Sequence, residues 1–177
     1  MKNPLKLIPL TPAVPHLPVL IYLPGMDGSG ILIQPQLQYL KAHFEVWGLA
    51  LPSHDRRDWD ELLADTAQLL TKIRKNQHRS IYLCGESFGG CLGLQLLHHY
   101  PHLGDRLIIV NSASAFQHQP VLRWSVPLVH WFAPTLYTWA THGLLPFLAD
   151  WERVSEAHRH LLLGAMQSVH PETAAWR

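Results

Sequence analysis

The sequence predicts an α/β fold, in which a parallel sheet is flanked by helices and followed by a C-terminal helical cap. Short apolar segments alternate with helical ones across residues 19–115, as in βαβ units that build a parallel sheet. The first such segment, Pro18–Leu23, is apolar throughout, which is typical of a strand buried on both faces. From about Phe116 onward the pattern is purely helical, so we expect residues 116–177 to form the cap. A chain of 177 residues suits one domain.

Composition and charge limit the partners that the chain can have. A hydrophobic content of 47% with 15% charged residues is typical of a globular chain with a sizeable core. The formal net charge of +1 creates no strong field, so we expect no nucleic acid partner. The two cysteines, Cys84 and Cys91, make no disulfide framework and favour a reduced, cytoplasmic location. The N-terminus also lacks the apolar core of a secretory signal.

The predicted elements follow one another in a regular order. Residues 1–18 are rich in proline, so we expect an extended lead-in before the core of residues 19–115. Asp58 and Glu61 have the spacing of a capping box at a helix N-terminus. We expect further strands at Phe44–Leu51, Ser80–Cys84 and Leu107–Val110, and helices at Gln34–His43, Asp58–Lys75 and Cys91–Tyr100.

The strongest local signal is the segment Gly85-Glu86-Ser87-Phe88-Gly89-Gly90. It follows an apolar strand and opens a helix, which is the context of a G-x-S-x-G nucleophile elbow. The glycines let strand and helix approach each other, and the strained turn presents the serine hydroxyl above the sheet edge. The helix N-terminus there favours the negative charge of an acyl-transfer intermediate. The sequence therefore predicts Ser87 as a catalytic nucleophile, the alternative being a chance match to a short pattern.

A glycine-rich loop, Pro24–Gly30, follows the first strand. In nucleophile-elbow enzymes the amide after the serine and an amide from an earlier loop bind the oxyanion. We assign these two amides to Phe88 and Met26, the alternative being a glycine-rich surface turn. The loop lacks the Lys and Ser or Thr of a phosphate-binding loop. The residues that we assign to support of the elbow and the loop are Gly25, Asp27, Gly28, Gly85, Glu86 and Gly89.

These residues resemble those of the α/β-hydrolase superfamily, of the esterase, lipase and thioesterase type. Three segments are also similar to those of the phytyl ester synthase-like acyltransferases of plastids and cyanobacteria, namely Leu23–Gly30, Ile81–Leu92 and Asn111–Phe116. The resemblance implies an α/β-hydrolase fold and acyl transfer through a serine ester. It implies lipophilic substrates, such as fatty acyl groups that pass to long-chain alcohols, to diacylglycerol or to water. It further implies a Ser, an Asp or Glu, and a His in that chain order, with the serine at Ser87.

The chain departs from this family after the fourth strand. The family's acid follows a strand downstream of the cap and its histidine follows a further strand, but the sequence reaches Arg177 in a helical pattern. Asn111, Ser112 and Ala113 offer no carboxylate directly after the fourth strand. We therefore expect a C-terminally truncated chain in which the last strands are missing. We assign no catalytic base among the histidines of the elbow helix and the cap region, which are His98, His99, His118, His130, His142, His158, His160 and His170.

The segment of residues 122–151 is rich in Trp, Leu and Pro. Its prolines disfavour a single membrane-spanning helix, although Trp124–Ala149 contains no Asp, Glu, Lys or Arg. The segment fits a cap over an apolar acyl pocket, with peripheral membrane contact, or a cap that packs on its own core. No histidine pair has a further ligand at suitable spacing, so we expect no metal and no cofactor. The oligomeric state stays open.

Three functions are consistent with this sequence. The first is a serine hydrolase or acyltransferase that acts on a small, lipophilic acyl ester through an acyl-serine intermediate. The second is a non-catalytic lipid-binding or interaction protein that keeps the elbow only as structure. The third is a serine peptidase, because peptidases and esterases share this elbow.

Overall fold

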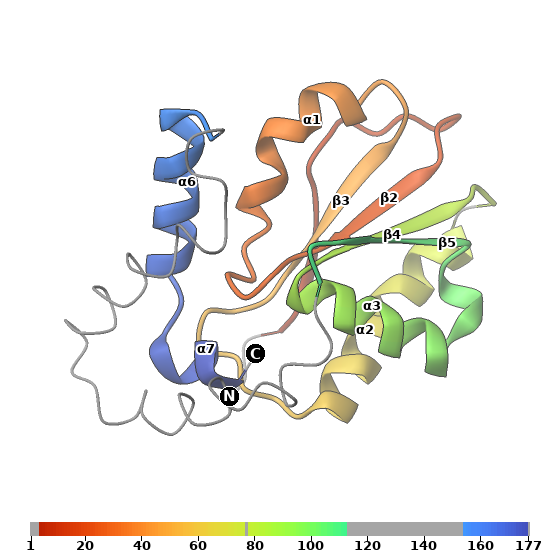
Figure 1. Ribbon diagram of the computed structural model, residues 1–177. Coiled ribbons are helices and arrows are strands. Elements are labelled where there is room, and N and C mark those ends of the chain that lie inside the picture. The colour runs from red at the N-terminus through yellow and green to blue at the C-terminus, as the bar shows by residue number, and fades with distance from the viewer. Residues whose placement is uncertain (1–3, 77, 113–153, 177) are drawn as a thin grey trace.

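A computed structural model describes residues 4–76, 78–112 and 154–176, which form a five-stranded sheet with helices on both faces (Figure 1). The strand order is β1-β3-β2-β4-β5. All neighbouring strands run parallel except β1 and β3, which are antiparallel. The strands are β1 (Lys6–Pro9), β2 (Val19–Leu23), β3 (Glu45–Ala50), β4 (Ile81–Glu86) and β5 (Arg106–Val110).

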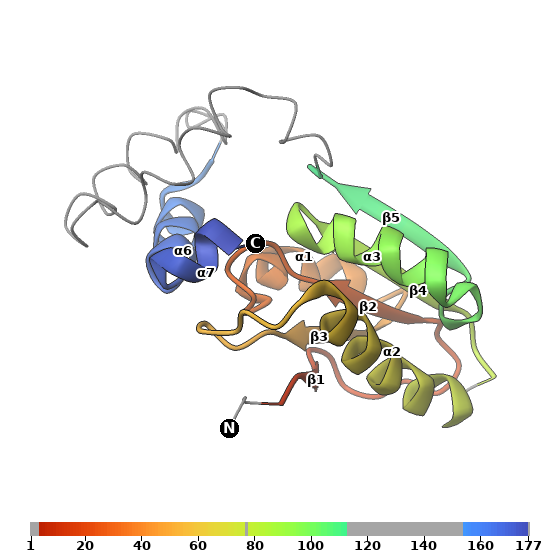
Figure 2. The ribbon, with the colours of Figure 1, turned by 90° about the horizontal axis from the view of Figure 1, so that it is seen from below.

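The helices connect successive parallel strands and cover both faces of the sheet. Figure 1 shows α1 on one face and α2 and α3 on the other, and Figure 2 shows α2 and α3 side by side. This arrangement confirms the predicted α/β-hydrolase fold class. The helices are α1 (Gln34–Leu40), α2 (Trp59–Asn76), α3 (Phe88–His99), α6 (Glu156–Gln167) and α7 (Pro171–Trp176), with short 3-10 turns η1 (Ile31–Ile33) and η2 (Pro101–Leu103).

The observed elements differ from the predicted ones chiefly in three places, namely the lead-in, the elbow and the end of α1, which is at Leu40 rather than at His43. The lead-in contains a strand, β1, which was not predicted because residues 1–18 are rich in proline. This strand pairs with β3 at the edge of the sheet, where proline is tolerated. Strand β4 continues through Gly85 and Glu86, so the turn before α3 contains Ser87 alone. The predicted helix cap is confirmed, because the Glu61 amide donates to Asp58 Oδ1 at 2.8 Å.

Two apolar cores lie on the two faces of the sheet. Alternate residues of the central strands point to opposite faces. One set packs with α2 and α3, and Val19, Ile21, Leu83, Leu92 and Leu96 are fully enclosed there. The other set, Leu20, Tyr22 and Val46, packs under α1 together with Ile33 of η1.

Strand β5 forms one edge of the described sheet. Its apolar side chains are unusually accessible, with Ile108, Ile109 and Val110 exposed by 40%, 46% and 45%. Most of the predicted cap, including residues 122–151, lies outside the described residues. No helix among the described residues is long and apolar enough to cross a membrane.

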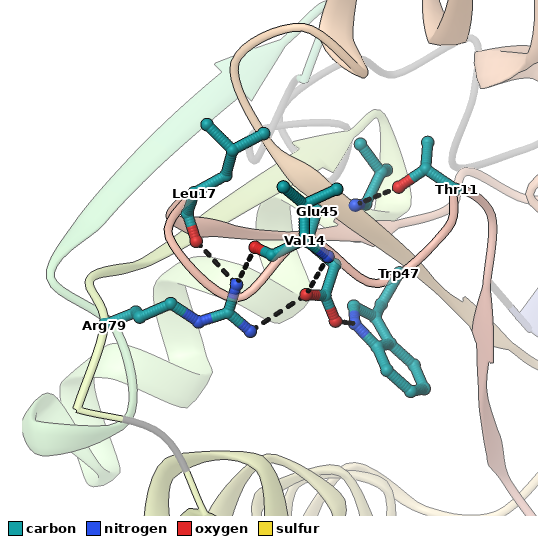
Figure 3. Close-up of polar contacts among 7 residues, drawn as sticks. Thr11, Val14, Leu17, Glu45, Trp47 and Arg79 are labelled. Atoms are coloured by element: carbon teal, nitrogen blue, oxygen red, sulfur yellow. Dashed lines mark hydrogen bonds and ion pairs between the residues drawn. The ribbon is translucent and has the colours of Figure 1, made fainter.

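A buried carboxylate fastens the lead-in to the sheet (Figure 3). Glu45 is 3% exposed and accepts hydrogen bonds from the Val14 amide at 3.1 Å, Trp47 Nε1 at 2.9 Å and Arg79 at 2.9 Å. Arg79 also donates to the carbonyls of Val14 and Leu17 at 2.6 and 2.7 Å. Burial alone would raise the pKa of Glu45, but the Trp47, Arg79 and Val14 donors outweigh it and lower the pKa below its usual value.

We expect Glu45→Gln to destabilise the fold at neutral pH, by about 3 kcal/mol because it leaves the Arg79 charge without its partner. A lowered folded pKa means that the ionised carboxylate stabilises the fold above the unfolded pKa, and that this contribution disappears as the pH falls through the folded pKa. The difference in Tm between wild type and variant should therefore shrink on acidification below pH 4.5. Circular dichroism melts across this range test the effect, with Glu156→Gln at an exposed helix start as the control. A difference independent of pH would contradict the assignment.

Candidate active site

Ser87 lies on a sharp turn between β4 and α3 and has a strained backbone. Its φ and ψ angles are 51° and −115°, and a positive φ is uncommon for a residue with a side chain. The residue before it ends β4 and the residue after it begins α3. The structure thus gives Ser87 the strand–turn–helix setting and the unusual backbone of a nucleophile elbow.

Two glycines make this turn possible because other backbone atoms occupy the space of their missing side chains. A Cβ placed on Gly85 would lie 2.3 Å from the Gly89 carbonyl oxygen. A Cβ placed on Gly89 would lie 2.0 Å from the Leu23 carbonyl oxygen and 2.7 Å from that of Pro24. The ends of β2 and β4 and the first turn of α3 therefore meet at backbone contact.

The backbone of Ser87 is held from the neighbouring strand. Its amide donates to the carbonyl of Val110, the last residue of β5, at 3.0 Å. Its carbonyl accepts from the Gly90 amide at 3.0 Å and from Ser112 Oγ at 2.8 Å. The sequence places Ser112 in the segment Asn111–Phe116 and at a position without a carboxylate, but it does not predict the bond that its hydroxyl makes. The signal in the sequence is its position two residues after β5, the strand that neighbours β4.

The predicted oxyanion loop lies against the elbow. A Cβ on Gly25 would lie 3.6 Å from both the Ser87 Cβ and the Glu86 carbonyl oxygen, so the loop after β2 touches the turn after β4. The loop is closed by a hydrogen bond of 3.1 Å from the Gly28 amide to the Gly25 carbonyl. Met26 lies in this turn. The loop that carries Met26 thus lies at the same end of the parallel strands as Ser87 and Phe88.

Asp27 shapes the loop through one of its two carboxylate oxygens. Oδ2 accepts from the Ser29 amide at 2.9 Å and from the Ser29 hydroxyl. Oδ1 is buried and has no hydrogen-bond partner among the residues that the structure describes. The position of Asp27 is consistent with its predicted role in loop support.

Glu86 joins β4 to β2 beneath the elbow. Its carboxylate accepts a hydrogen bond from the hydroxyl of Tyr22. Burial, reinforced by this bond and by the Glu86 charge, raises the pKa of Tyr22, so the phenol stays protonated and remains a donor. The sequence predicts that Tyr22 lies in a buried strand but does not predict this contact, which depends on the pairing of β2 with β4.

An aromatic cluster surrounds the residue after Ser87. The Phe88 ring, which is 6% exposed, lies 5.3 Å from the ring of Trp59 and 6.0 Å from that of Trp176. These two tryptophans begin α2 and end α7. Helix α7, which lies in the segment predicted to form the cap, therefore reaches the first turn of α3.

The acid and the histidine that the family resemblance implies have no assigned position in the described ranges. Within residues 4–76, 78–112 and 154–176, no side chain hydrogen-bonds to the Ser87 hydroxyl, since Ser112 bonds to the Ser87 carbonyl instead. His54 and His170 contact each other, with ring centroids 5.0 Å apart. A pocket of about 340 Å³ on the α1 face has Glu86 in its wall, but Ser87 does not line it. The same ranges hold no group of three His, Cys, Asp or Glu side chains suited to a metal.

Comparison with known proteins identifies the family. Residues 53–169, more than half of the chain, match the family described as serine aminopeptidase, S33. The chain belongs to this family of α/β-hydrolases. Its fold is similar to that of MenH from S. aureus, with a TM-score of 0.72 at 17% identity over 98% of this chain and 69% of that protein.

Two plant proteins are similar in sequence to this α/β-hydrolase. Phytyl ester synthase 1, chloroplastic, of Arabidopsis thaliana is 37% identical over 105 residues, which are 59% of this chain. Phytyl ester synthase 2, chloroplastic, of the same plant is 36% identical over 100 residues, or 55% of this chain. The matches confirm the predicted resemblance to phytyl ester synthases. The chain spans only 15% and 14% of the length of these two relatives.

We expect Gly89→Ala to destabilise this α/β-hydrolase by about 3 kcal/mol, because backbone atoms of β2 must move to admit the methyl group. Gly164→Ala in α6 is the matched control, since a Cβ there meets no atom within 4 Å. That control should leave stability unchanged or raise it by about 1 kcal/mol through helix propensity. Urea unfolding of both variants measures the difference, and equal free energies of unfolding would show that the close approach at Gly89 is unimportant.

Proposed function

We propose that this chain carries the nucleophile of a serine hydrolase or acyltransferase that acts on lipophilic acyl esters through an acyl-serine at Ser87. The observation that carries the proposal is the backbone of Ser87, with φ 51° and ψ −115° on a one-residue turn between strand and helix. This conformation is costly and places Ser87 at a helix N-terminus, where a developing negative charge is stabilised.

The proposed chemistry proceeds in two steps. Ser87 Oγ bonds to the acyl carbonyl carbon, the amides of Phe88 and Met26 donate to the oxyanion, and the ester's alcohol leaves with the serine proton. Water or an acceptor alcohol then attacks the acyl-serine, which releases acid or a new ester and restores the hydroxyl. The first outcome is hydrolysis and the second is acyl transfer.

A lipophilic acyl group as the substrate is supported by two observations. The Trp59–Phe88–Trp176 cluster gives the surroundings of the elbow an apolar character. The two plant relatives are named for the synthesis of phytyl esters, which contain a long-chain alcohol. A cytoplasmic location and peripheral membrane contact through residues 122–151 remain predictions.

A fluorophosphonate tests the nucleophile directly, because it reacts with an activated serine hydroxyl. Because the described residues supply no base to the Ser87 hydroxyl, we expect slow labelling of the chain, at Ser87 alone, and we expect Ser87→Ala to abolish it. Ser80→Ala, at the exposed residue before β4, is the control and should leave labelling unchanged. Intact-protein mass spectrometry with peptide mapping provides the measurement. A folded wild-type chain without label would favour the non-catalytic lipid-binding alternative.

A serine peptidase is the second candidate function, favoured by the serine aminopeptidase description of the matching family. A substrate panel separates the two functions. We expect p-nitrophenyl acyl esters to be cleaved with a preference for long chains, and aminoacyl p-nitroanilides to be poor substrates. Adding a long-chain alcohol should divert part of the acyl group into a new ester if transfer occurs. Faster release from the anilides than from the esters would establish the peptidase instead.

A further inference from the structure

Ser112 lies two residues after β5 and contacts the elbow. The chemistry proposed above gives this contact no role. Its hydroxyl donates to the carbonyl oxygen of Ser87 at 2.8 Å. Asn111 has a positive φ of 46°, which turns the chain back at the end of β5. Asn is one of the few residues that adopt this conformation readily. The contact between Ser112 and Ser87 is thus built by a specific turn in the backbone.

The carbonyl that Ser112 binds belongs to the same peptide group as the Phe88 amide. A trans peptide group is planar, and its C=O and N–H point in opposite directions. Ser112 Oγ and the Gly90 amide at 3.0 Å both fix the direction of this C=O. They therefore also fix the direction of the Phe88 N–H, one of the two proposed oxyanion donors.

The hydroxyl also affects the strength of this donor. A hydrogen bond accepted by an amide oxygen polarises the whole peptide group, so that its N–H becomes a better donor. Oxyanion donors act by being positioned before the reaction begins, and loss of one such donor has large effects on turnover. A hydroxyl that orients and polarises the donor peptide should have a smaller effect in the same direction.

The glycine that follows the elbow pattern gives independent support. A Cβ on Gly90 would lie 2.5 Å from Ser112 Oγ and 2.6 Å from Ser112 Cβ. The G-x-S-x-G pattern itself does not require a glycine at this position. The absence of a side chain at Gly90 leaves the space in which the Ser112 hydroxyl reaches the Ser87 carbonyl.

We propose that Ser112 is a positioning residue of the oxyanion hole, which acts through the Ser87–Phe88 peptide group. The inference rests on the proposed function of Ser87 for its catalytic meaning. The geometric part of the inference is that the Ser112 hydroxyl orients and polarises the Phe88 amide. This part can be tested without measuring turnover.

The first test is an NMR measurement on the full chain labelled with ¹⁵N-phenylalanine. Only five phenylalanines are present, so the backbone amide spectrum is simple, and Phe88→Leu identifies the Phe88 signal. We expect Ser112→Ala to shift this signal more than the other phenylalanine signals, and Ser112→Thr to restore it. The control Thr71→Ala removes a hydroxyl-to-carbonyl bond of 2.7 Å inside α2 and should leave Phe88 unchanged. A Phe88 signal unaltered by Ser112→Ala would overturn the proposal.

The second test measures reaction at Ser87. We expect Ser112→Ala to lower the fluorophosphonate labelling rate and the kcat for a p-nitrophenyl ester by about 3- to 10-fold, the effect of one net hydrogen bond, with KM unchanged. Ser112→Thr should recover the rate and Thr71→Ala should keep it. A fall in kcat/KM that comes from KM alone would overturn the positioning role, and so would an equal fall in Thr71→Ala. A wild-type chain that does not label would refute the proposed function, while the NMR test would still decide the geometry.

Discussion

The carbonyl oxygen of Leu23 leaves no room for a side chain at Gly89, and this contact brings three parts of the chain together. The end of β2, the end of β4 and the first turn of α3 approach each other closely enough for their backbones to touch. Because β2 and β4 are parallel neighbours, the loop after β2 and the turn after β4 both lie at the carboxyl ends of the parallel strands. The strained backbone of Ser87 persists because the surrounding contacts determine it.

A site built in this way depends on peptide groups more than on side chains. The proposed oxyanion donors are the amides of Met26 and Phe88, whose directions follow from the loop and the elbow. Substitutions that keep the backbone in place are therefore easier to accommodate at these two positions than at Gly85 or Gly89, where any side chain collides with backbone. The positions that tolerate the fewest substitutions are thus the glycines, together with the few residues, such as Ser112, that hold a peptide group in place.

The sequence predicted the parallel sheet, the order of its helices and the position of the elbow, because apolar runs and glycine patterns are local signals. Strand β1 was not predicted, since its pairing with β3 depends on residues distant in the chain and its prolines suggested a loop. The Glu45–Arg79 ion pair and the Tyr22–Glu86 bond were missed for the same reason. The predicted cap residues 122–151 lie outside the described ranges, and no described histidine or carboxylate was identified as the partner of Ser87.

The tryptophan rings beside Phe88 provide a fluorescence signal close to the elbow. Trp59 and Trp176 are 6.3 Å apart and nearly parallel, with an interplanar angle of 28°. Indole emission depends on local polarity and on neighbouring rings, so separation of α7 from α2 would change both its wavelength and its intensity. The chain has seven tryptophans, and the difference between wild type and Trp59→Phe reports the emission of Trp59 and its effect on Trp176. The protein therefore contains an intrinsic fluorescent reporter next to its proposed nucleophile.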